Sequence, residues 1–326
     1  MKIPKTAFFV RNQFQVSHLA PLFRKIDNAR WVVTRRRDIA AFGIERDDCD
    51  VVPLFLRRHL ERFDIVVSHA APPRGRPLRR AAFVMVQYGY AKAPYNFGPW
   101  RAQAQAILAY GPFAKRQFER HAPSYVIGNP RWDDWQPDQL KAVAQAALPA
   151  LDTTKPVILY APTWGALSSL PQWLGAIQDL ARDHTVLVKA HHNSIRDGQL
   201  DFADVHPHVH DVSGHDLMQL LALCDIVVSD YSGAIFDGIM CKKPVVLLDV
   251  NDIEKQFGNK LDAKSIEMSR RDELGFRVQE KSDLCDTIYA ALTQPSPVSG
   301  ELDQDLFLRP KSVAQNFADL LPTLVR

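Results

Sequence analysis

The stretch Cys224–Asp237, CDIVVSDYSGAIFD, and the stretch Lys242–Asp249, KKPVVLLD, specify a strand, a loop, a helix and a second strand. Ile226–Ser229 and Val245–Asp249 are short runs rich in valine, isoleucine and leucine, which is typical of buried strands. Between them, Ser232 and a following glycine stand where a helix would begin. A strand, a helix and a strand in this order form a right-handed crossover between parallel strands. The two stretches therefore predict an open parallel sheet flanked by helices.

The same alternation continues along the 326 residues. Further strands are expected at Thr6–Val10, Trp31–Val33, Asp64–Ser68, Phe83–Gln87, Ile107–Tyr110, Tyr125–Gly128, Val157–Tyr160 and Thr185–Lys189. Helical patterns occupy Val16–Ile26, Phe113–His121, Leu170–Arg182, Leu217–Leu223 and Leu284–Leu292. Strands separated by helices indicate an α/β fold, and the length exceeds that of one ordinary domain.

The sequence therefore predicts two Rossmann-like, doubly wound domains in tandem. The first is expected at residues 1–150 and the second at residues 151–326. A segment with proline and threonine, Ala147–Pro156, marks the expected boundary. A final amphipathic helix at 312–324 is expected to dock on one of the two domains, with the first domain as the candidate.

Composition excludes several classes of protein. The hydrophobic share of 46% and the charged share of 24% are ordinary for a globular chain. Four cysteines, none in a Cys-x-x-Cys pair, argue against a zinc site and a disulfide framework. No apolar run is long enough to cross a bilayer, and the N-terminus lacks a signal-peptide pattern. We therefore expect a cytoplasmic protein.

Charge is distributed unevenly along the chain. Residues 1–140 hold 23 Lys and Arg against 12 Asp and Glu, or +11, and the remainder holds 17 against 25, or −8. Arginines cluster in the first half at Arg35, Arg36 and Arg37, at Arg57 and Arg58, and at Arg74, Arg76, Arg79 and Arg80. Such a field favours an anionic acceptor or an anionic membrane surface at the inner face of the cell membrane. Nucleic acid is not an expected partner, because no nucleic-acid-binding motif accompanies the charge.

Polar clusters follow several of the expected strands in the second half. They are Ala161–Gly165, Lys189–Asn193 and Asp230–Asp237. In open parallel sheets, ligands bind beyond the carboxyl ends of the strands, where helix N-termini attract anions. Ser232 and Gly233 offer a hydroxyl and backbone amides at such a point. The pattern predicts a cradle for a pyrophosphate group.

Residues 156–250 resemble the CDP-glycerol glycerophosphotransferase family of teichoic-acid and capsule enzymes. The matching motifs are YAPTW at Tyr160–Trp164, a Lys-x-His pair at Lys189 and His191, and the strings Cys224–Asp237 and Lys242–Asp249. In the first half, VIGNPRWD at Val126–Asp133 resembles the Gly-x-Pro-Arg-x-Asp run of the family. The resemblance implies the glycosyltransferase-B fold and a transferase that needs no metal or cofactor. Its donor would be a nucleotide-activated substrate, and the resemblance implies a CDP-linked one.

The resemblance also implies roles for individual residues. His191 would stabilise charge on the departing nucleotide, and Lys189 would add positive field. Hydroxyls of Ser229 and Ser232 would hold the pyrophosphate, and Asp237 would accept from a donor hydroxyl. The full expected donor-binding set is Thr163, Lys189, His192, Ser229, Asp230, Ser232, Gly233 and Asp237, with His191 as a catalytic residue.

The sequence departs from the family pattern in the first half. Family members carry Trp-His-Gly after an N-terminal strand, and that histidine is the expected general base. Here the stretch reads Gln87-Tyr88-Gly89, so the base must come from elsewhere. His69 ends the expected strand Asp64–Ser68, faces the ligand edge of the sheet and is the candidate. Gly165 and His192 also replace the family's usual arginine and proline.

The leading hypothesis is transfer of a glycerol-phosphate-like or sugar group from a CDP- or other NDP-linked donor. The acceptor would be a hydroxyl of a cell-surface polymer or of a lipid-linked glycan. Two alternatives remain open. One is a nucleotide-sugar glycosyltransferase or epimerase of the same fold, and the other is a non-catalytic accessory subunit of a glycan-synthesis complex.

Overall fold

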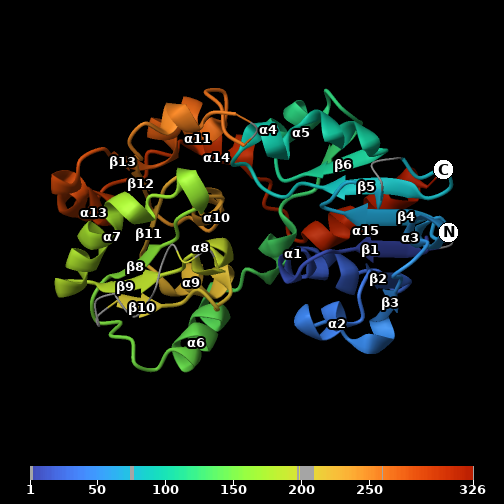
Figure 1. Cartoon of the computed structure of the whole chain (residues 1–326), viewed down its shortest axis with the longest axis horizontal. Helices are drawn as coiled ribbons and strands as arrows, with labels where there is room; N and C mark the ends of the chain where they lie inside the picture. The colour runs from blue at the N-terminus through green and yellow to red at the C-terminus, as the bar shows by residue number, and fades with distance from the viewer. Residues whose placement is uncertain (1–2, 74–76, 197, 199–208, 259, 326) are drawn as a thin grey trace. The chain divides into compact units, whose positions relative to one another are not determined.

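The computed structural model describes residues 3–73, 77–196, 198, 209–258 and 260–325. Arg74 and Arg76, from one of the arginine clusters, lie outside the described residues. The chain forms two compact units (Figure 1). Unit 1 comprises Met1–Tyr88, Phe97–Asp134 and Gln304–Arg326, and unit 2 comprises Gly89–Asn96 and Trp135–Asp303. The expected boundary at 147–156 lies inside unit 2.

Unit 1 is built on a parallel sheet. Its described strands are β1 (Thr6–Phe9), β2 (Ala29–Val33), β3 (Cys49–Val51), β4 (Ile65–Ser68), β5 (Ala82–Val86), β6 (Ala106–Ala109) and β7 (Ser124–Val126). They lie in the order β3-β2-β1-β4-β5-β6-β7, with every neighbouring pair parallel. The order reverses between β1 and β4. This reversal is the switch point at which doubly wound sheets bind ligands.

Helices of unit 1 are α1 (Gln13–Arg24), α2 (Arg37–Ala41), α3 (Leu56–Leu60), α5 (Pro112–Phe118) and α15 (Val313–Leu324). The expected C-terminal helix is α15, and it packs on α1 of unit 1. Phe317 of α15 lies edge-on to Phe8 of β1, with ring centroids 6.2 Å apart. The carboxylate of Asp133 accepts from the first amides of α15, Val313 N at 2.6 Å and Ala314 N at 2.8 Å. The aspartate of the VIGNPRWD motif thus fixes the start of the last helix.

Unit 2 repeats the architecture. Its described strands are β8 (Val157–Tyr160), β9 (Thr185–Val188), β10 (Val209–Asp211), β11 (Ile226–Ser229), β12 (Val245–Leu248) and β13 (Phe276–Val278). Its helices are α4 (Ala93–Asn96), α6 (Pro137–Ala147), α7 (Leu170–Asp179), α8 (His192–Arg196), α9 (Leu217–Leu223), α10 (Ala234–Met240), α11 (Ile266–Ser269), α12 (Arg271–Leu274) and α13 (Leu284–Thr293). A further helix, α14 (Gly300–Leu306), spans the point where the chain passes back to unit 1. The strands are all parallel in the order β10-β9-β8-β11-β12-β13, so the switch point lies between β8 and β11.

The two faces of this sheet are covered by different helices, because side chains alternate along each strand. Ile158 and Val228 belong to a core cluster that also contains residues of α7 and α13. On the other face, α10 lies so close that a Cβ added at Gly238 would stand 3.2 Å from Val245 and 3.3 Å from Val227. The sheet is therefore buried on both sides, and its open edge is the one where the strands end.

The described residues include three strands that the sequence did not predict. They are β3, β10 and β13, each three residues long and each at the edge of its sheet. An edge strand has one neighbour and partly exposed side chains, so its sequence lacks the long apolar run of a central strand. Short edges leave the predicted α/β class unchanged.

Candidate functional site

The carboxyl ends of β8 and β11 bring two of the predicted motifs together. The chain leaves β8 through YAPTW, leaves β11 through SDYSG, and the two strands are hydrogen-bonded neighbours at the switch point of unit 2. The loop amide of Thr163 donates to Asp230 Oδ1 at 2.8 Å, which ties one motif to the other. The candidate site is built on this connection.

Asp230 is the buried anchor of the two loops. Its side chain is fully buried and accepts four hydrogen bonds, from Thr163 N, Ser169 N and Oγ, and Tyr231 N, at 2.7 to 2.9 Å. Burial raises the pKa of the carboxyl, and the hydrogen bonds from Ser169 and Thr163 oppose this. All these contacts are internal, so the structure shows Asp230 holding the loops in place.

Ser229 has a comparable structural contact. Its hydroxyl is fully buried and donates to the carbonyl oxygen of Ala161 at 2.7 Å. The bond joins the end of β11 to the first residue after β8. The predicted contact of Ser229 with a donor stays a prediction.

The start of α10 holds the other predicted phosphate ligands. Ser232 is half-buried, and its Oγ accepts from Ala234 N at 3.3 Å. Gly233 is exposed, with a φ of −59°, and a Cβ added there would meet nothing within 4 Å. The backbone is therefore unstrained and open at this point, as close approach by a ligand requires. Asp237 lies in the first turn of α10 and is half-buried.

His191 forms part of an aromatic stack beside the YAPTW loop. Its ring stacks on Trp164 with centroids 5.7 Å apart, and the ammonium of Lys260 lies 4.1 Å from the Trp164 centroid in a cation–π contact. His191 Nδ1 accepts from Asn193 N at 3.2 Å, which places the proton of the neutral ring on Nε2. An Nε2–H donor can stabilise charge on a departing phosphate.

Lys189 is held by backbone carbonyl groups. Its ammonium donates to Ser213 O at 3.1 Å and to His215 O at 2.6 Å, on the loop between β10 and α9. Burial lowers its pKa, and Asp216 and Asp211 raise it. Two of its three protons are therefore engaged in fixing that loop. His192 begins α8, and its side chain lies outside the described residues.

The sequence analysis did not identify Lys92 and Glu267 as residues of this site. Lys92 belongs to the Gly89–Asn96 segment of unit 2, and its ammonium donates to Thr163 Oγ1 at 2.7 Å. Its backbone N–H donates to the carboxylate of Glu267, a fully buried residue on α11. Burial raises the pKa of Glu267 to about 7, although the hydrogen bond from Lys92 and the charges of Lys92 and Arg271 oppose the shift. A lysine so far from the other motifs in sequence carries no local signal of this position.

Arg271 supports the same strand ends. The guanidinium is almost fully buried and donates to Asp230 O at 2.9 Å, Leu248 O at 2.8 Å and the Asp249 carboxylate at 2.7 Å. It also lies over the Tyr231 ring, 4.3 Å from the centroid. The carbonyl groups at the ends of β11 and β12 are thus satisfied by one side chain, and the site has a rigid base.

His69 stands at the corresponding edge of unit 1. It follows β4, is 3% exposed, and its Nδ1 donates to Val86 O at 3.1 Å. Its Nε2 is buried and has no partner among the described residues. Burial lowers the pKa of His69 to about 3, helped by the charge of Arg101. The ring is therefore neutral, with the Nε2 lone pair that a base requires, but it does not titrate at an ordinary histidine's pKa.

A second histidine, missed in the sequence analysis, adjoins His69. His18 of α1 lies 5.6 Å from His69 between ring centroids, and both rings contact Tyr88, at 6.3 and 5.4 Å. Burial and the neighbouring His69 hold the pKa of His18 well below its usual range. Tyr88, which replaces the family's histidine, therefore packs against two neutral imidazoles.

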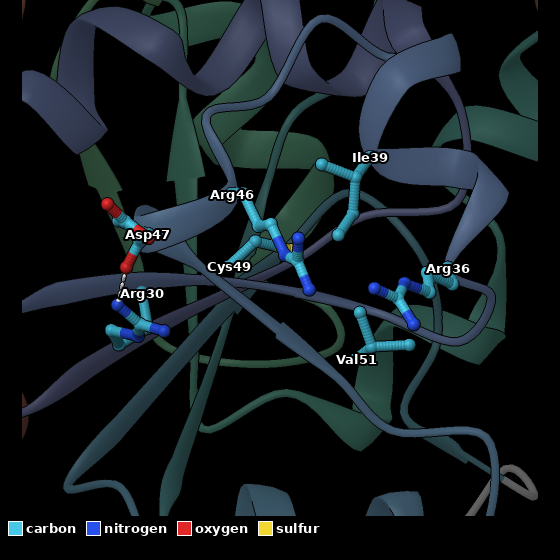
Figure 2. Close-up of a pocket in the computed structure, with 7 residues that line it drawn as sticks. All are labelled: Arg30, Arg36, Ile39, Arg46, Asp47, Cys49 and Val51. Atoms are coloured by element: carbon cyan, nitrogen blue, oxygen red, sulfur yellow. Dashed lines mark hydrogen bonds between the residues drawn. The ribbon is translucent and has the colours of Figure 1, made fainter.

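Arg36, from the cluster Arg35–Arg37, borders a hollow of about 410 Å³ in unit 1. Figure 2 shows the Arg36 and Arg46 side chains together with Ile39 and Val51 around it. Arg30 is engaged with Asp50 at 2.7 Å. Residues 30–51 contain five arginines and five acidic residues, so the local net charge is zero. Three arginines, Arg30, Arg36 and Arg46, and one acidic residue, Asp47, line the hollow itself.

Within the described ranges, no group of three or more His, Cys, Asp or Glu side chains is placed to hold a metal ion. In the same part of the chain, no helix is both long and apolar enough to cross a membrane.

Comparison with known proteins supports the fold and shows a family resemblance. The wall teichoic acid polymerase TagF has a similar structure, with a TM-score of 0.69, 17% identity, and coverage of 98% of this chain and 89% of that one. UDP-GlcNAc 2-epimerase from Neisseria meningitidis, solved with UDP-GlcNAc, follows with a TM-score of 0.60, 16% identity and 98% coverage of both chains. A putative UDP-N-acetylglucosamine 2-epimerase from Listeria monocytogenes gives 0.64, 15% identity, and 99% and 96% coverage. These structures confirm the predicted fold of two doubly wound domains.

No curated protein sequence matches the chain significantly. Residues 108–260 match the model of the CDP-glycerol:poly(glycerophosphate) glycerophosphotransferase family. This region begins in β6 and includes the YAPTW, Lys-x-His and SDYSG motifs, so the predicted resemblance is confirmed. Over residues 108–260, just under half of the chain, the sequence is therefore similar to the CDP-glycerol:poly(glycerophosphate) glycerophosphotransferase family, and this similarity supports a transferase-type enzyme.

Proposed function

We propose that this protein transfers a glycerol-phosphate group from a CDP-linked donor to a hydroxyl of a cell-surface polymer or lipid-linked acceptor. The description of the matched family supports this reaction. A variant of the TagF polymerase soaked with CDPG has a TM-score of 0.69 to this chain, at 16% identity, with 99% of this chain and 89% of that chain covered. The fold and the family thus point to the same class of donor.

The observation that carries the proposal is the meeting of YAPTW and SDYSG at the β8/β11 switch point. Both motifs lie in the matched region, and Thr163 and Asp230 join them by a hydrogen bond. Ser232 and the open backbone at Gly233 then offer a hydroxyl and amides to one phosphate of the donor. We assign the donor pyrophosphate to this place, with Asp237 and His192 as neighbouring donor contacts.

The chemistry requires three contributions. The acceptor oxygen bonds to the phosphorus that carries glycerol, the bond from that phosphorus to the oxygen of CMP breaks, and the acceptor proton passes to a base. His191 Nε2–H would stabilise the charge that develops on CMP, with Lys189 adding positive potential. His69 is the proposed base. No cofactor or resident metal ion is part of this proposal.

The basic first half of the chain supports an anionic acceptor. Its +11 over 140 residues would attract a phosphate-containing polymer or an anionic bilayer at the inner face of the cell membrane. The protein would then work in the cytoplasm, at that surface.

Calorimetry with CDP, UDP and GDP, followed by a transfer assay with CDP-glycerol, tests the donor assignment. We expect CDP to bind most tightly, and CMP to be released only when an acceptor or water takes the glycerol-phosphate group. Failure of the folded protein to bind any of the three at millimolar concentration would remove the proposed function.

The rival with specific support is a nucleotide-sugar enzyme. The match to this chain covers at least 96% of the length of each of two epimerase structures. In addition, Tyr88 replaces the histidine expected in a glycerophosphotransferase. Preference for UDP over CDP, with turnover of UDP-N-acetylglucosamine, would favour that activity. Weak nucleotide binding with no turnover of any donor would favour the accessory subunit.

A further inference from the structure

The segment Gly89–Asn96 belongs to unit 2 although it follows β5 of unit 1. The Tyr90 ring packs against Phe236 of α10, with centroids 5.2 Å apart. Ala93 N donates to the hydroxyl of Ser265, beside α11, at 3.3 Å. The segment is therefore anchored to the helix that follows SDYSG and to the residue that precedes α11.

Lys92 is the most constrained residue of this segment. Its φ is +64°, in the left-handed region that a lysine seldom adopts. The conformation is held from both sides, because its N–H donates to Glu267 and its carbonyl accepts from Tyr95 N and Asn96 N, both at 2.9 Å. Backbone strain of this kind persists where the surroundings over-determine it, and it gathers at ligand sites.

The ammonium of Lys92 is brought to the ends of β8 and β11. It donates to Thr163 Oγ1 at 2.7 Å, and the amide of Thr163 is in turn bonded to Asp230. An ammonium has three protons to donate. Among the described residues Thr163 is its one hydrogen-bond acceptor, and the side chain is only partly buried. Two donors thus remain for a ligand at the switch point.

The charges around Lys92 suit an anion. Burial lowers the pKa of Lys92. The charges of Asp230 and Glu267 oppose this shift, and the charge of Lys260 adds to it. Oε2 of Glu267 is buried and has no partner among the described residues. Lys92 is therefore a cation beside two buried carboxyl groups, and a second cation, Lys260, lies near it. An incoming phosphate would stabilise the ammonium form of Lys92.

We propose that Lys92 binds the donor's diphosphate directly and that Glu267 is the positioning residue that holds Lys92 at the strand ends. The inference rests on the proposed function, because it assigns a ligand to the same donor site. The ligand class is a nucleoside diphosphate or its ester, recognised through its phosphate oxygens. Lys92 would supply a direct cation that Lys189, held by two carbonyl groups, supplies only at a distance.

The first test compares Lys92→Met with Lys155→Met by calorimetry. Lys155 precedes β8 at the opposite edge of the same sheet, so its loss removes equal charge away from the strand ends. With CDP and with inorganic pyrophosphate, we expect Lys92→Met to bind about 10- to 100-fold more weakly than the wild type. Affinity for cytidine, which has no phosphate, should be the same for all three proteins.

The positioning role is tested with Glu267→Gln and Glu267→Ala. Glutamine keeps an acceptor for the Lys92 N–H, so it should retain CDP affinity within about threefold. Alanine removes the acceptor and should approach the loss seen for Lys92→Met, again with unchanged cytidine binding. Equal CDP affinity in the alanine variant and the wild type would overturn the positioning role.

A measurement on the wild-type protein does not depend on whether the substituted variants fold. An amine-reactive reagent followed by mass spectrometry should label Lys92 in the free protein, and saturating CDP should protect it while Lys155 reacts as before. Unprotected Lys92, or full CDP affinity in Lys92→Met, would overturn the inference alone. A wild type that binds neither CDP nor pyrophosphate would instead overturn the proposed function.

Discussion

Glu267→Gln should change how the stability of the protein depends on pH. The carboxyl is fully buried, and its pKa is raised from 4.5 to about 7 in the folded state. The folded protein therefore holds this proton more tightly than the unfolded chain does. The corresponding stability is fully present below pH 4.5 and is lost as the pH rises through about 7. The shift is worth about 3 kcal/mol in total, of which about 2 to 3 kcal/mol falls between pH 5 and pH 8.

Urea unfolding at pH 5, 6, 7 and 8 measures this contribution, with tryptophan fluorescence as the signal. The substitution replaces the carboxyl by an amide and so places an NH₂ group near the position of the unpartnered Oε2. The variant therefore carries a cost that does not vary with pH. The informative quantity is the change with pH in the difference between variant and wild type. We expect the variant to gain about 2 to 3 kcal/mol on the wild type from pH 5 to pH 8.

Glu254→Gln is the matched control, since Glu254 is exposed and its substitution removes the same charge. Its difference from the wild type should be nearly constant over this range. If Glu267→Gln also shows a constant difference, the carboxyl does not bind its proton more tightly in the folded state. That result would refute the raised pKa of Glu267.

Three further predictions concern the other anchors of the two units. Gly233→Ala should leave the melting temperature unchanged, because its Cβ meets nothing within 4 Å, yet it should weaken CDP binding about tenfold by calorimetry if a phosphate lies there. Asp230→Ala should cost about 3 kcal/mol or more in urea unfolding, since it leaves four internal donors without their acceptor. His69→Ala should lower transfer about 100- to 10,000-fold with little change in CDP affinity. The wild-type rate should show no acidic limb near pH 6.5 from this residue, because the pKa of His69 is about 3. Transfer by the variant at the wild-type rate would remove His69 as the base.

The central strands were predictable because a strand that is buried on both faces has a continuous run of apolar residues. β8 and β11 begin and end at the residues expected from their apolar runs. The sequence also predicted that the motifs gather at one edge of the sheet, and the observed strand order places YAPTW and SDYSG side by side there. The part of the site that depends on strand ends was therefore accessible from sequence.

The roles of individual polar side chains were less accessible, because a motif does not say which atoms face inward. Ser229 and Asp230 are adjacent to the exposed Gly233 loop in sequence, yet both are fully buried and bonded to backbone. Only the direction in which each Cβ leaves the strand separates a hydroxyl that holds a loop from one that meets a ligand.

The resemblance placed the base after β5, and the same stretch proves important for a different reason. Tyr88 ends the part of the chain that belongs to unit 1, and Gly89 begins the segment that belongs to unit 2. In unit 1, Tyr88 stands where the family has its histidine, and the rings of His18 and His69 lie against it. Lys92, on the second side, adds a cation to the switch point. A single loop therefore contributes to both units, and under the proposed function we expect a substitution in it to alter donor binding without touching any donor motif.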